Sequence, residues 1–173
     1  MTLQLTTNLV WEAVEKETFA VIGMVTPKNE ARTVGIVYVV RDRKLYFGSF
    51  TKMWKVRHIS ANPHVSLTIA IDKRVPLMPW IKIPAATITF SGTARVLETG
   101  EVPPDLLQDV FSNKDVDDQF IADSCVIEVT PEKDFITYGV GIPLMQMRYP
   151  NKSRGRAPVN GKRRTDQNSA TIS

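Results

Sequence analysis

The segment GSFTKMWK, which begins at Gly48, combines residue types that bind a phosphate group. It follows an apolar run expected to be a strand, and it begins a stretch expected to be helical. The first N–H groups of a helix have no partner within the helix, and the helix dipole adds positive charge there, so an anion can satisfy both. Ser49 and Thr51 supply hydroxyl groups to such a site. Lys52 and Lys55 are three residues apart, which makes them neighbours on a helix surface.

The helical periodicity of this segment separates its charged residues into two groups. Three apolar residues form the stripe expected to be buried: Met53, Val56 and Ile59. Lys52 and Lys55 flank this stripe on one side, and Trp54, Arg57 and His58 lie on the other. Two interpretations stay open, a phosphate cradle or a solvent-exposed basic helix in which Thr51 caps the N-terminus. The segment is not a Walker-type loop, because the glycine spacing and the final GK[ST] are absent.

The rest of the chain predicts the elements that must position this segment. Strands are expected, from apolar and β-branched runs, at residues 18–26, 32–40, 45–50, 64–72, 81–98 and 124–139. Helices are expected at residues 7–17, 51–61 and 103–112. Short connections between the first strands indicate an antiparallel meander. Six antiparallel strands with few helices predict a mainly β (α+β) fold, a small closed or nearly closed β-barrel with peripheral helices.

Composition and charge set the expected domain boundary. The chain has 173 residues, of which 43% are hydrophobic, which is sufficient for one domain with a substantial core. We expect this domain to span residues 1–150. The net charge is +4, and residues 151–173 contain six Lys and Arg against one acid. Because this last segment lacks apolar periodicity, we expect a disordered basic tail, and we predict no nucleic-acid partner.

Several sequence features bear on location and chemistry. The N-terminus does not have the pattern of a signal peptide, and the apolar runs are too short to span a bilayer, so we expect a cytoplasmic protein without a membrane partner. The single cysteine, Cys125, lies in an apolar run and is expected to be a small buried hydrophobe. No metal site is predicted, because neither histidine has ligands at suitable spacing. No catalytic residue is identified, so a bound cofactor would supply any chemistry.

The order of these motifs resembles the pyridoxamine 5′-phosphate oxidase-like family of FMN-binding split barrels. The resemblance rests on the first hairpin, the strand KLYFGS, the basic helix TKMWKVRHI and the strand start NPHVSL. It covers residues 10–72 well and continues more loosely through ATITFSGTARVLE. It implies a split barrel that forms a homodimer, with FMN sites at the subunit interface.

The resemblance also implies roles for particular residues. The phosphate of FMN would be held by Ser49, Thr51, Lys52 and Lys55. The backbone of the second strand would run along the flavin ring, and there the cofactor-binding residues would be Val34, Gly35, Ile36 and Val37. At Gly35 the missing side chain lets a flat ring approach, although a bulge or cross-strand packing also accounts for a glycine.

Departures from the family limit what the resemblance implies about activity. Members commonly have asparagine at the position of His58 and arginine at that of His64. The C-terminal signature of true pyridoxamine phosphate oxidases, rich in Arg and Trp, is absent, so that reaction is not expected. The resemblance therefore favours an FMN-dependent oxidoreductase that passes a hydride through flavin N5 to a small molecule. The alternatives are a reductase that uses the deazaflavin F420, and a flavin- or haem-binding sensory module without turnover.

Two further segments are candidates for covering the cofactor. In IPLMQMRYP, the side chains of Met145, Met147 and Tyr149 would form a soft lid over the partner subunit's flavin, or else pack in the dimer interface. In PLMPW, Trp80 would stack on a ring or anchor the loop to the core.

Overall fold

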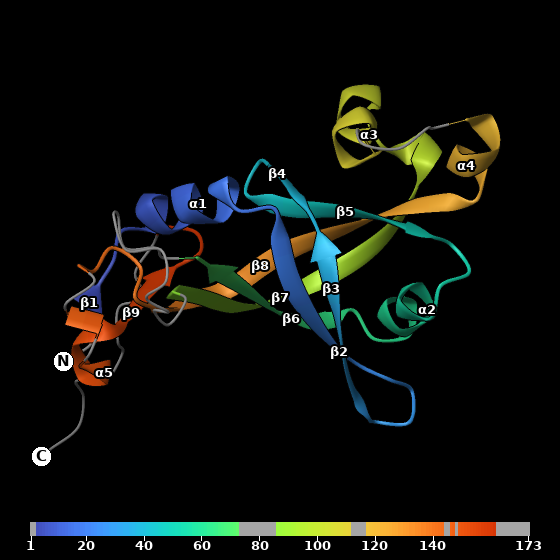
Figure 1. The fold of residues 1–173 in the computed structure, drawn as a ribbon. Helices are drawn as coiled ribbons and strands as arrows, with labels where there is room; N and C mark the ends of the chain where they lie inside the picture. The colour runs from blue at the N-terminus through green and yellow to red at the C-terminus, as the bar shows by residue number, and fades with distance from the viewer. Residues whose placement is uncertain (1–2, 73–85, 112–116, 144–145, 148, 162–173) are drawn as a thin grey trace, which may run out of the picture.

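The computed structural model describes residues 3–72, 86–111, 117–143, 146–147 and 149–161. Within them the chain forms a nine-stranded sheet and several short helices (Figure 1). The strands are β1 (Leu3–Gln4), β2 (Phe19–Val25), β3 (Ala31–Val37), β4 (Val39–Arg41), β5 (Lys44–Phe50), β6 (His64–Ile71), β7 (Ala86–Glu98), β8 (Ser124–Tyr138) and β9 (Arg154–Pro158). The helices are α1 (Thr7–Lys16), α2 (Trp54–Ala61), the 3-10 turn η1 (Thr99–Glu101), α3 (Pro104–Phe111), α4 (Asp118–Ala122) and α5 (Pro150–Ser153).

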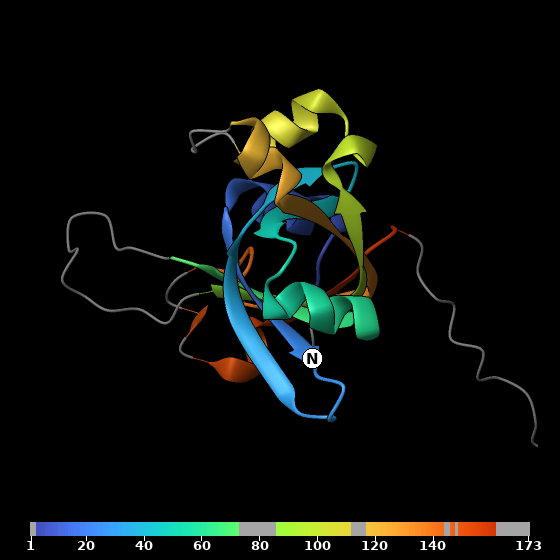
Figure 2. The ribbon, with the colours of Figure 1, turned by 90° about the vertical axis from the view of Figure 1, so that its right-hand side faces the viewer.

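The sheet is antiparallel except where β1 pairs with β9, and it curls into a half-barrel (Figure 2). Its main path runs β1-β9-β8-β7-β6-β2-β3, and β5 branches from β8 and carries β4. The long strand β8 makes this branch possible, because its first half pairs with β5 and its second half with β9. The expected split-barrel, mainly β fold is confirmed.

The expected strand at residues 32–40 is divided at Tyr38. Before Tyr38, β3 pairs with β2, and after it β4 pairs with β5, with Val39 opposite Tyr46. The chain therefore changes partners at Tyr38. Because β3 stays on β2 while β5 pairs with β4 and β8, β3 and β5 do not pair with each other. The space between these two strands is the opening of the split barrel, and the candidate site lies there.

The core fills the concave side of the sheet and is closed at one end by α1. Trp11 of α1 packs edge-on against Phe135, whose ring in turn meets Phe90. The Trp11 indole N–H donates to the carbonyl of Val159 at 3.1 Å, and the Tyr38 hydroxyl donates to the carbonyl of Val14 at 2.8 Å. These two bonds satisfy the polar atoms of two large buried side chains and fix α1 on the barrel.

A second, smaller cluster of apolar residues lies under α3 and α4, away from the main core. Its buried members are Tyr46, Leu97, Val102, Leu106, Phe111 and Val126. The expected helix at residues 103–112 is present as α3, and α4 was not expected from the sequence. Figure 1 shows α3 and α4 together at the end of the sheet formed by the last residues of β5 and β7 and the first residues of β8.

The expectation of a disordered tail from residue 151 is wrong for the part that the structure describes. Residues 154–158 form β9, which pairs with both β8 and β1, and Ala157 and Val159 are buried. The alternating basic residues account for the error: Arg154 and Arg156 point outward, while Gly155 and Ala157, which alternate with them, face the interior. Residues 162–173 lie outside the described residues.

Met147, expected to face a partner subunit, is instead buried within its own chain. Its side chain fills the space above Gly139, and its carbonyl accepts a hydrogen bond from the Tyr138 hydroxyl at 3.0 Å. Tyr149 is exposed. Met145 and the loop that carries Trp80 lie outside the described residues.

Candidate functional site: a groove in the opening of the barrel

A groove of about 420 Å³ lies where β3 and β5 separate, and we call it the split groove. Residues from β3 and β4, from β5, from α2 and from α3 form its walls. They are Thr18, Gly35, Ile36, Val37, Tyr38, Val39, Tyr46, Phe47, Gly48, Lys55, Asp109, Val110 and Phe111. Its volume falls in the range of small-molecule and cofactor sites.

The backbone of β3 presents polar groups to this groove. Tyr38 N–H donates to the carbonyl of Thr18 at 2.9 Å, so this pair is of the hydrogen-bonded type. Hydrogen-bonded and non-hydrogen-bonded pairs alternate along an antiparallel ladder. Ile36, two residues before Tyr38, is therefore also hydrogen-bonded to β2, whereas Gly35 and Val37 are not. The N–H and C=O groups of Gly35 and Val37 therefore point away from β2, along the edge that borders the groove. A flat ligand with polar atoms on its rim can pair with such an edge.

The space over Gly35 on the outer face of β3 is taken by a neighbouring side chain. A Cβ at this position would lie 2.8 Å from the ring of Phe19 on β2. Cross-strand packing thus accounts for the glycine on this face. A ring bound in the split groove would meet the backbone edge of Gly35 rather than its Cα face.

Lys55 is the cation of the split groove that comes from α2. The helix begins at Trp54, with Met53 as the N-cap residue, and Met53 supplies no side-chain cap. Val56 and Ile59 are buried against the barrel, and this orientation directs Lys55 toward β3 and β5. Burial raises the pKa of the Cys125 thiol on β8, and the nearby Lys55 ammonium opposes that rise. Because Lys55 itself lines the groove, it adds a positive charge there.

Helix α3 forms the far wall of the split groove, and a glycine lets it approach. The ring of Phe111 lies so close to Gly48 that an added Cβ would clash with it. Phe111 is buried and packs edge-on against Phe120 of α4. Gly48 lies within β5 and is therefore needed for close packing of α3 on this strand.

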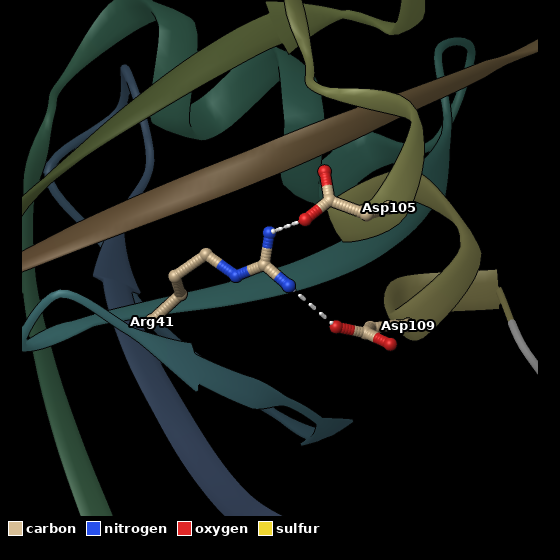
Figure 3. A network of polar contacts seen from close by, with 3 residues as sticks. All are labelled: Arg41, Asp105 and Asp109. Carbon is tan, nitrogen blue, oxygen red and sulfur yellow. Dashed lines mark hydrogen bonds and ion pairs between the residues drawn. The ribbon is translucent and has the colours of Figure 1, made fainter.

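An arginine on β4 ties α3 to the sheet (Figure 3). The guanidinium of Arg41 bonds the carboxylates of Asp105 and Asp109, which are four residues apart on one face of α3; its Nη2 lies 2.8 Å from Asp109 Oδ2. The hydrogen bond from Arg41 holds the pKa of the Asp105 carboxyl below its ordinary value of 3.8. Since Asp109 also lines the split groove, Arg41 fixes the position of a carboxylate in its wall.

Replacing Arg41 by glutamine is expected to loosen α3 without unfolding the barrel. The amide hydrogens of α3 should exchange faster, while those of β6 and β7 should keep their protection. Low pH should act similarly on the parent protein: the pKa of Asp105 is depressed in the fold, so its contribution is present above pH 3.8 and is lost as the pH falls through the lowered value. Hydrogen-exchange mass spectrometry measures both. Unchanged exchange in α3 would show that apolar packing alone holds the helix.

Both tyrosine hydroxyls near the split groove are engaged elsewhere. The Tyr46 hydroxyl donates to Glu128 Oε2 at 2.9 Å, and Lys44 Nζ lies 3.2 Å from the same oxygen. Burial, followed by the bond to Glu128, raises the pKa of Tyr46 to about 12. Burial likewise raises the pKa of Tyr38. Both phenols are therefore neutral, and their hydroxyl groups are used in hydrogen bonds within the fold. They form part of the groove wall and do not exchange protons in the site.

The structure brings together half of the residues predicted for cofactor binding. Gly35, Ile36, Val37 and Lys55 all line the split groove. Val34 lies next to them on β3, and its side chain packs partly against the core.

The other three predicted residues do not line the groove. Ser49 is buried, and its hydroxyl donates to the carbonyl of Phe50 at 3.3 Å. Thr51 does not cap α2; its hydroxyl and its N–H both donate to the carbonyl of Asp123, at 3.1 and 2.9 Å. Lys52 is exposed and precedes the helix. Of the three, Thr51 joins the end of β5 to Asp123, the residue before β8.

Residues of the groove that sequence reasoning missed come from α3, from β5 and from the junction between β3 and β4. Asp109, Val110 and Phe111 lie more than fifty positions after Lys55, and no local pattern connects them with it. The sequence offered a weak signal for the contact between Arg41 and α3, since Asp105 and Asp109 have the i, i+4 spacing of one helix face. Their arginine partner is not evident from that spacing.

The curled antiparallel sheet, open between β3 and β5, makes the chain a split-barrel protein. It belongs to the pyridoxamine 5'-phosphate oxidase family, whose sequence pattern matches residues 7–136. Comparison with curated protein sequences finds no significant match. Among the described residues, no helix is long and apolar enough to cross a membrane, and no three His, Cys, Asp or Glu side chains gather as metal ligands would.

Solved structures with the same fold differ widely in what their names describe. A putative pyridoxamine 5'-phosphate oxidase from Listeria innocua superposes with a TM-score of 0.57 at 16% identity, over 73% of this chain and 94% of that one. An F420 reductase superposes with a TM-score of 0.51 at 22% identity, over 69% and 91%. A heme-binding protein from Mycobacterium smegmatis gives 0.63 at 10% identity, over 93% and 61%. At these identities the likeness establishes the fold alone.

Proposed function

We propose that this chain binds FMN in the split groove and acts as a flavin-dependent oxidoreductase on a small molecule. One observation carries the proposal: the free backbone edge of Gly35 and Val37 and the ammonium group of Lys55 border the same groove. A flavin needs hydrogen-bonding groups along the rim of its ring and positive charge at its phosphate. The groove offers both on rigid elements, which favours preorganised binding.

The residues of the chain would divide the work of binding between them. Gly35 and Val37 would fix the plane of the ring through backbone hydrogen bonds, and Lys55 would pair with the phosphate. Val110 and Phe111 of α3 would cover the apolar part of the ring and exclude water. When bound, FMN supplies hydride transfer at N5, and the protein supplies orientation and electrostatics.

F420 is the second candidate, because the fold is shared with an F420 reductase. Its longer anionic tail favours additional cations close to the phosphate site. Arg57, the described candidate for that role, lies on the opposite side of α2 from Lys55 and does not line the split groove. Lys82, another cation that could pair with that tail, lies outside the described residues. The arrangement of the described residues therefore favours FMN.

Haem is a weaker candidate for the same groove. Among the described residues that line it there is no His, Cys or Met. Its two tyrosines donate their hydroxyl hydrogens to Val14 and Glu128. A haem iron in this position would have no available axial ligand from these side chains.

A homodimer is proposed together with the flavin site, because the groove borders an exposed apolar surface. Val37 is 70% exposed, and Phe19 and Val21, beside it on β2, are 51% and 39% exposed. An apolar patch of this kind on the outer face of β2 and β3 is typical of a protein interface. A second copy seated there would complete the outer wall of the groove. Light scattering of the purified protein measures the oligomeric state directly.

Ligand titration tests the proposed function. We expect FMN to bind about 10- to 100-fold more tightly than riboflavin, because only FMN carries the phosphate that pairs with Lys55. F420 and haemin, titrated in parallel, should bind more weakly than FMN. Anaerobic addition of a reduced nicotinamide should bleach the bound flavin. Equal affinity for FMN and riboflavin would contradict the assigned phosphate site, and FMN bound without bleaching by any donor would indicate a binding module.

A further inference from the structure

The segment that follows β9 is fixed to the barrel up to Val159 and then leaves it. The Val159 N–H donates to the carbonyl of Lys133 at 3.0 Å, and the Val159 carbonyl accepts the indole N–H of Trp11 at 3.1 Å. The Val159 side chain is buried. The next two residues, Asn160 and Gly161, lie in a turn and are both exposed. An Asn-Gly pair therefore follows directly after the last residue that these bonds hold.

An asparagine loses its side-chain amide when the backbone nitrogen of the next residue attacks it. That nitrogen gives its proton to solvent and forms a bond to the asparagine Cγ, while the bond from Cγ to the amide nitrogen breaks and ammonia leaves. The product is a five-membered cyclic imide, which water opens to aspartate or, at the other carbonyl, to isoaspartate. The reaction consumes one water and releases one ammonia, without oxidant or cofactor. A following glycine favours the attack, because it has no Cβ to hinder it.

The reaction requires that the attacking N–H is not held in a hydrogen bond and that the backbone can rotate until its nitrogen faces Cγ. The Gly161 N–H and the Asn160 side chain form no hydrogen bond with any residue that the structure describes. Gly161 has a φ of 70°, and in the described part of the chain no atom beyond its neighbours lies within 4 Å of where a Cβ would stand. A glycine in open space moves between left- and right-handed conformations at little cost. The pair therefore meets both requirements.

The asparagines near the N-terminus do not meet the first requirement, because the N–H after each of them is hydrogen-bonded. The N–H that follows Asn8 donates to the Thr6 hydroxyl at 3.3 Å, at the start of α1. The N–H that follows Asn29 donates to the Thr26 hydroxyl at 3.1 Å, in the β2–β3 turn. In both places the backbone nitrogen is held away from the asparagine side chain that it would attack.

Two asparagines further along the chain are also protected. Asn62 is followed by Pro63, which has no N–H to lose. The N–H that follows Asn151 donates to the carbonyl of Tyr149 at 2.9 Å, within α5. Two more asparagines lie outside the described residues: Asn113 and Asn168. Of the asparagines that the structure describes, Asn160 alone is followed by an N–H that is not held in a hydrogen bond.

We propose that Asn160 is a site of spontaneous deamidation, to which the fold directs the reaction among the described asparagines. Attack by the Gly161 nitrogen converts Asn160 into a mixture of aspartate and isoaspartate. The product places a negative charge next to a run of cations, Lys162, Arg163 and Arg164, and lowers the net charge of +4 by one. The modification thus weakens the positive charge of the C-terminal segment as the protein ages. This site lies outside the split groove and does not depend on flavin binding.

Mass spectrometry of the full chain after incubation in neutral and in mildly alkaline buffer tests this proposal. Trypsin cleaves after Arg156 and Lys162, so residues 157–162 form one peptide. We expect this peptide to gain one mass unit with time, and faster in the alkaline buffer, because the attacking nitrogen must lose its proton. A sample digested without incubation corrects for deamidation during digestion. The melting temperature should stay the same, since the hydrogen bonds of Val159 precede the reacting residue.

Two variants test the attacking and the attacked group separately. Asn160→Gln keeps a side-chain amide in the turn but requires a six-membered ring, so its peptide should not gain mass over the same time. Gly161→Ala adds a Cβ to the attacking residue and should slow the reaction about tenfold, which corresponds to about 1.4 kcal/mol of activation free energy. An unchanged rate in Gly161→Ala would contradict attack by this nitrogen.

The protein unfolded in urea supplies the rate that applies without the fold. The folded protein should modify Asn160 at about the same rate as the unfolded one, while the peptides of the other described asparagines keep their mass. A rate about tenfold lower in the folded protein would mean that the fold protects this turn, and would overturn the proposal. Deamidation of Asn8, Asn29 or Asn151 in the folded protein at the rate of Asn160 would overturn it too, because the hydrogen bonds would then not direct the reaction.

Discussion

Replacing Lys55 by alanine is expected to weaken FMN binding about 10- to 100-fold and to leave riboflavin binding almost unchanged. Lys55 is the cation that α2 contributes to the split groove, and the phosphate is the only part of FMN that riboflavin lacks. Losing a charge-assisted hydrogen bond to the phosphate removes roughly 1.5–3 kcal/mol of binding free energy. Quenching of flavin fluorescence during titration gives both dissociation constants.

Lys52→Ala is the matched control for Lys55→Ala. Both changes remove one ammonium group from the same short segment, but Lys52 is exposed and does not line the split groove. Its replacement should therefore change FMN affinity little. A larger loss at Lys52 than at Lys55 would favour a phosphate cradle at the start of α2, as the sequence predicts, over the groove. Equal losses of FMN and riboflavin in Lys55→Ala would contradict a phosphate role for this residue.

The largest loss of stability is expected from replacing Phe135 by alanine. The side chain is fully buried, and its ring contacts both Trp11 of α1 and Phe90 of β7. Truncation leaves a cavity where α1, β7 and β8 meet, and such changes cost about 3–5 kcal/mol of unfolding free energy. The melting temperature should fall by roughly 6–20 °C. Denaturant titration and calorimetry measure the two quantities.

The neighbouring residue provides the control for this experiment. Ile136 follows Phe135 on β8, but it points to the opposite face of the sheet and is 53% exposed. Ile136→Ala should cost about 1 kcal/mol or less. If Ile136→Ala destabilised the protein as much as Phe135→Ala, the assigned register of β8 would be wrong, because a shift of one residue exchanges the two faces.

Local sequence patterns were sufficient for most of the elements. Thr6 caps α1 at the point that the polar run TTN indicates, and its side chain accepts the hydrogen bond of Leu9 N–H. The buried positions of α2, Val56 and Ile59, follow the helical periodicity. Cys125 is buried, as its apolar surroundings indicate. Periodicity and capping depend on residues within one or two turns of each other, so a sequence displays them directly.

Pairing between distant segments could not be predicted from local sequence patterns. Residues 154–158 have alternating Arg with Gly and Ala, a pattern typical of a polar tail unless a strand as long as β8 offers them a partner. The strand expected at residues 32–40 changes partners at Tyr38, because β4 pairs with β5 while β3 stays on β2. Both outcomes depend on contacts between residues far apart in sequence, which a local pattern does not encode.

For the candidate site, too, some features follow from local sequence and others from long-range contacts. By itself, the sequence determined that a basic segment follows a strand, that Lys55 flanks the buried stripe of α2, and that Gly35 and Val37 belong to one strand. The tertiary structure decided which of these residues share a groove. In the folded chain Ser49 is buried and Thr51 is hydrogen-bonded to Asp123. Helix α3 packs against Gly48, and the ion pair of Arg41 with Asp109 holds it there. The reason is physical: helical spacing fixes the direction of a side chain relative to its own helix, whereas the opening between β3 and β5 exists only once the sheet has curled and the strands have paired.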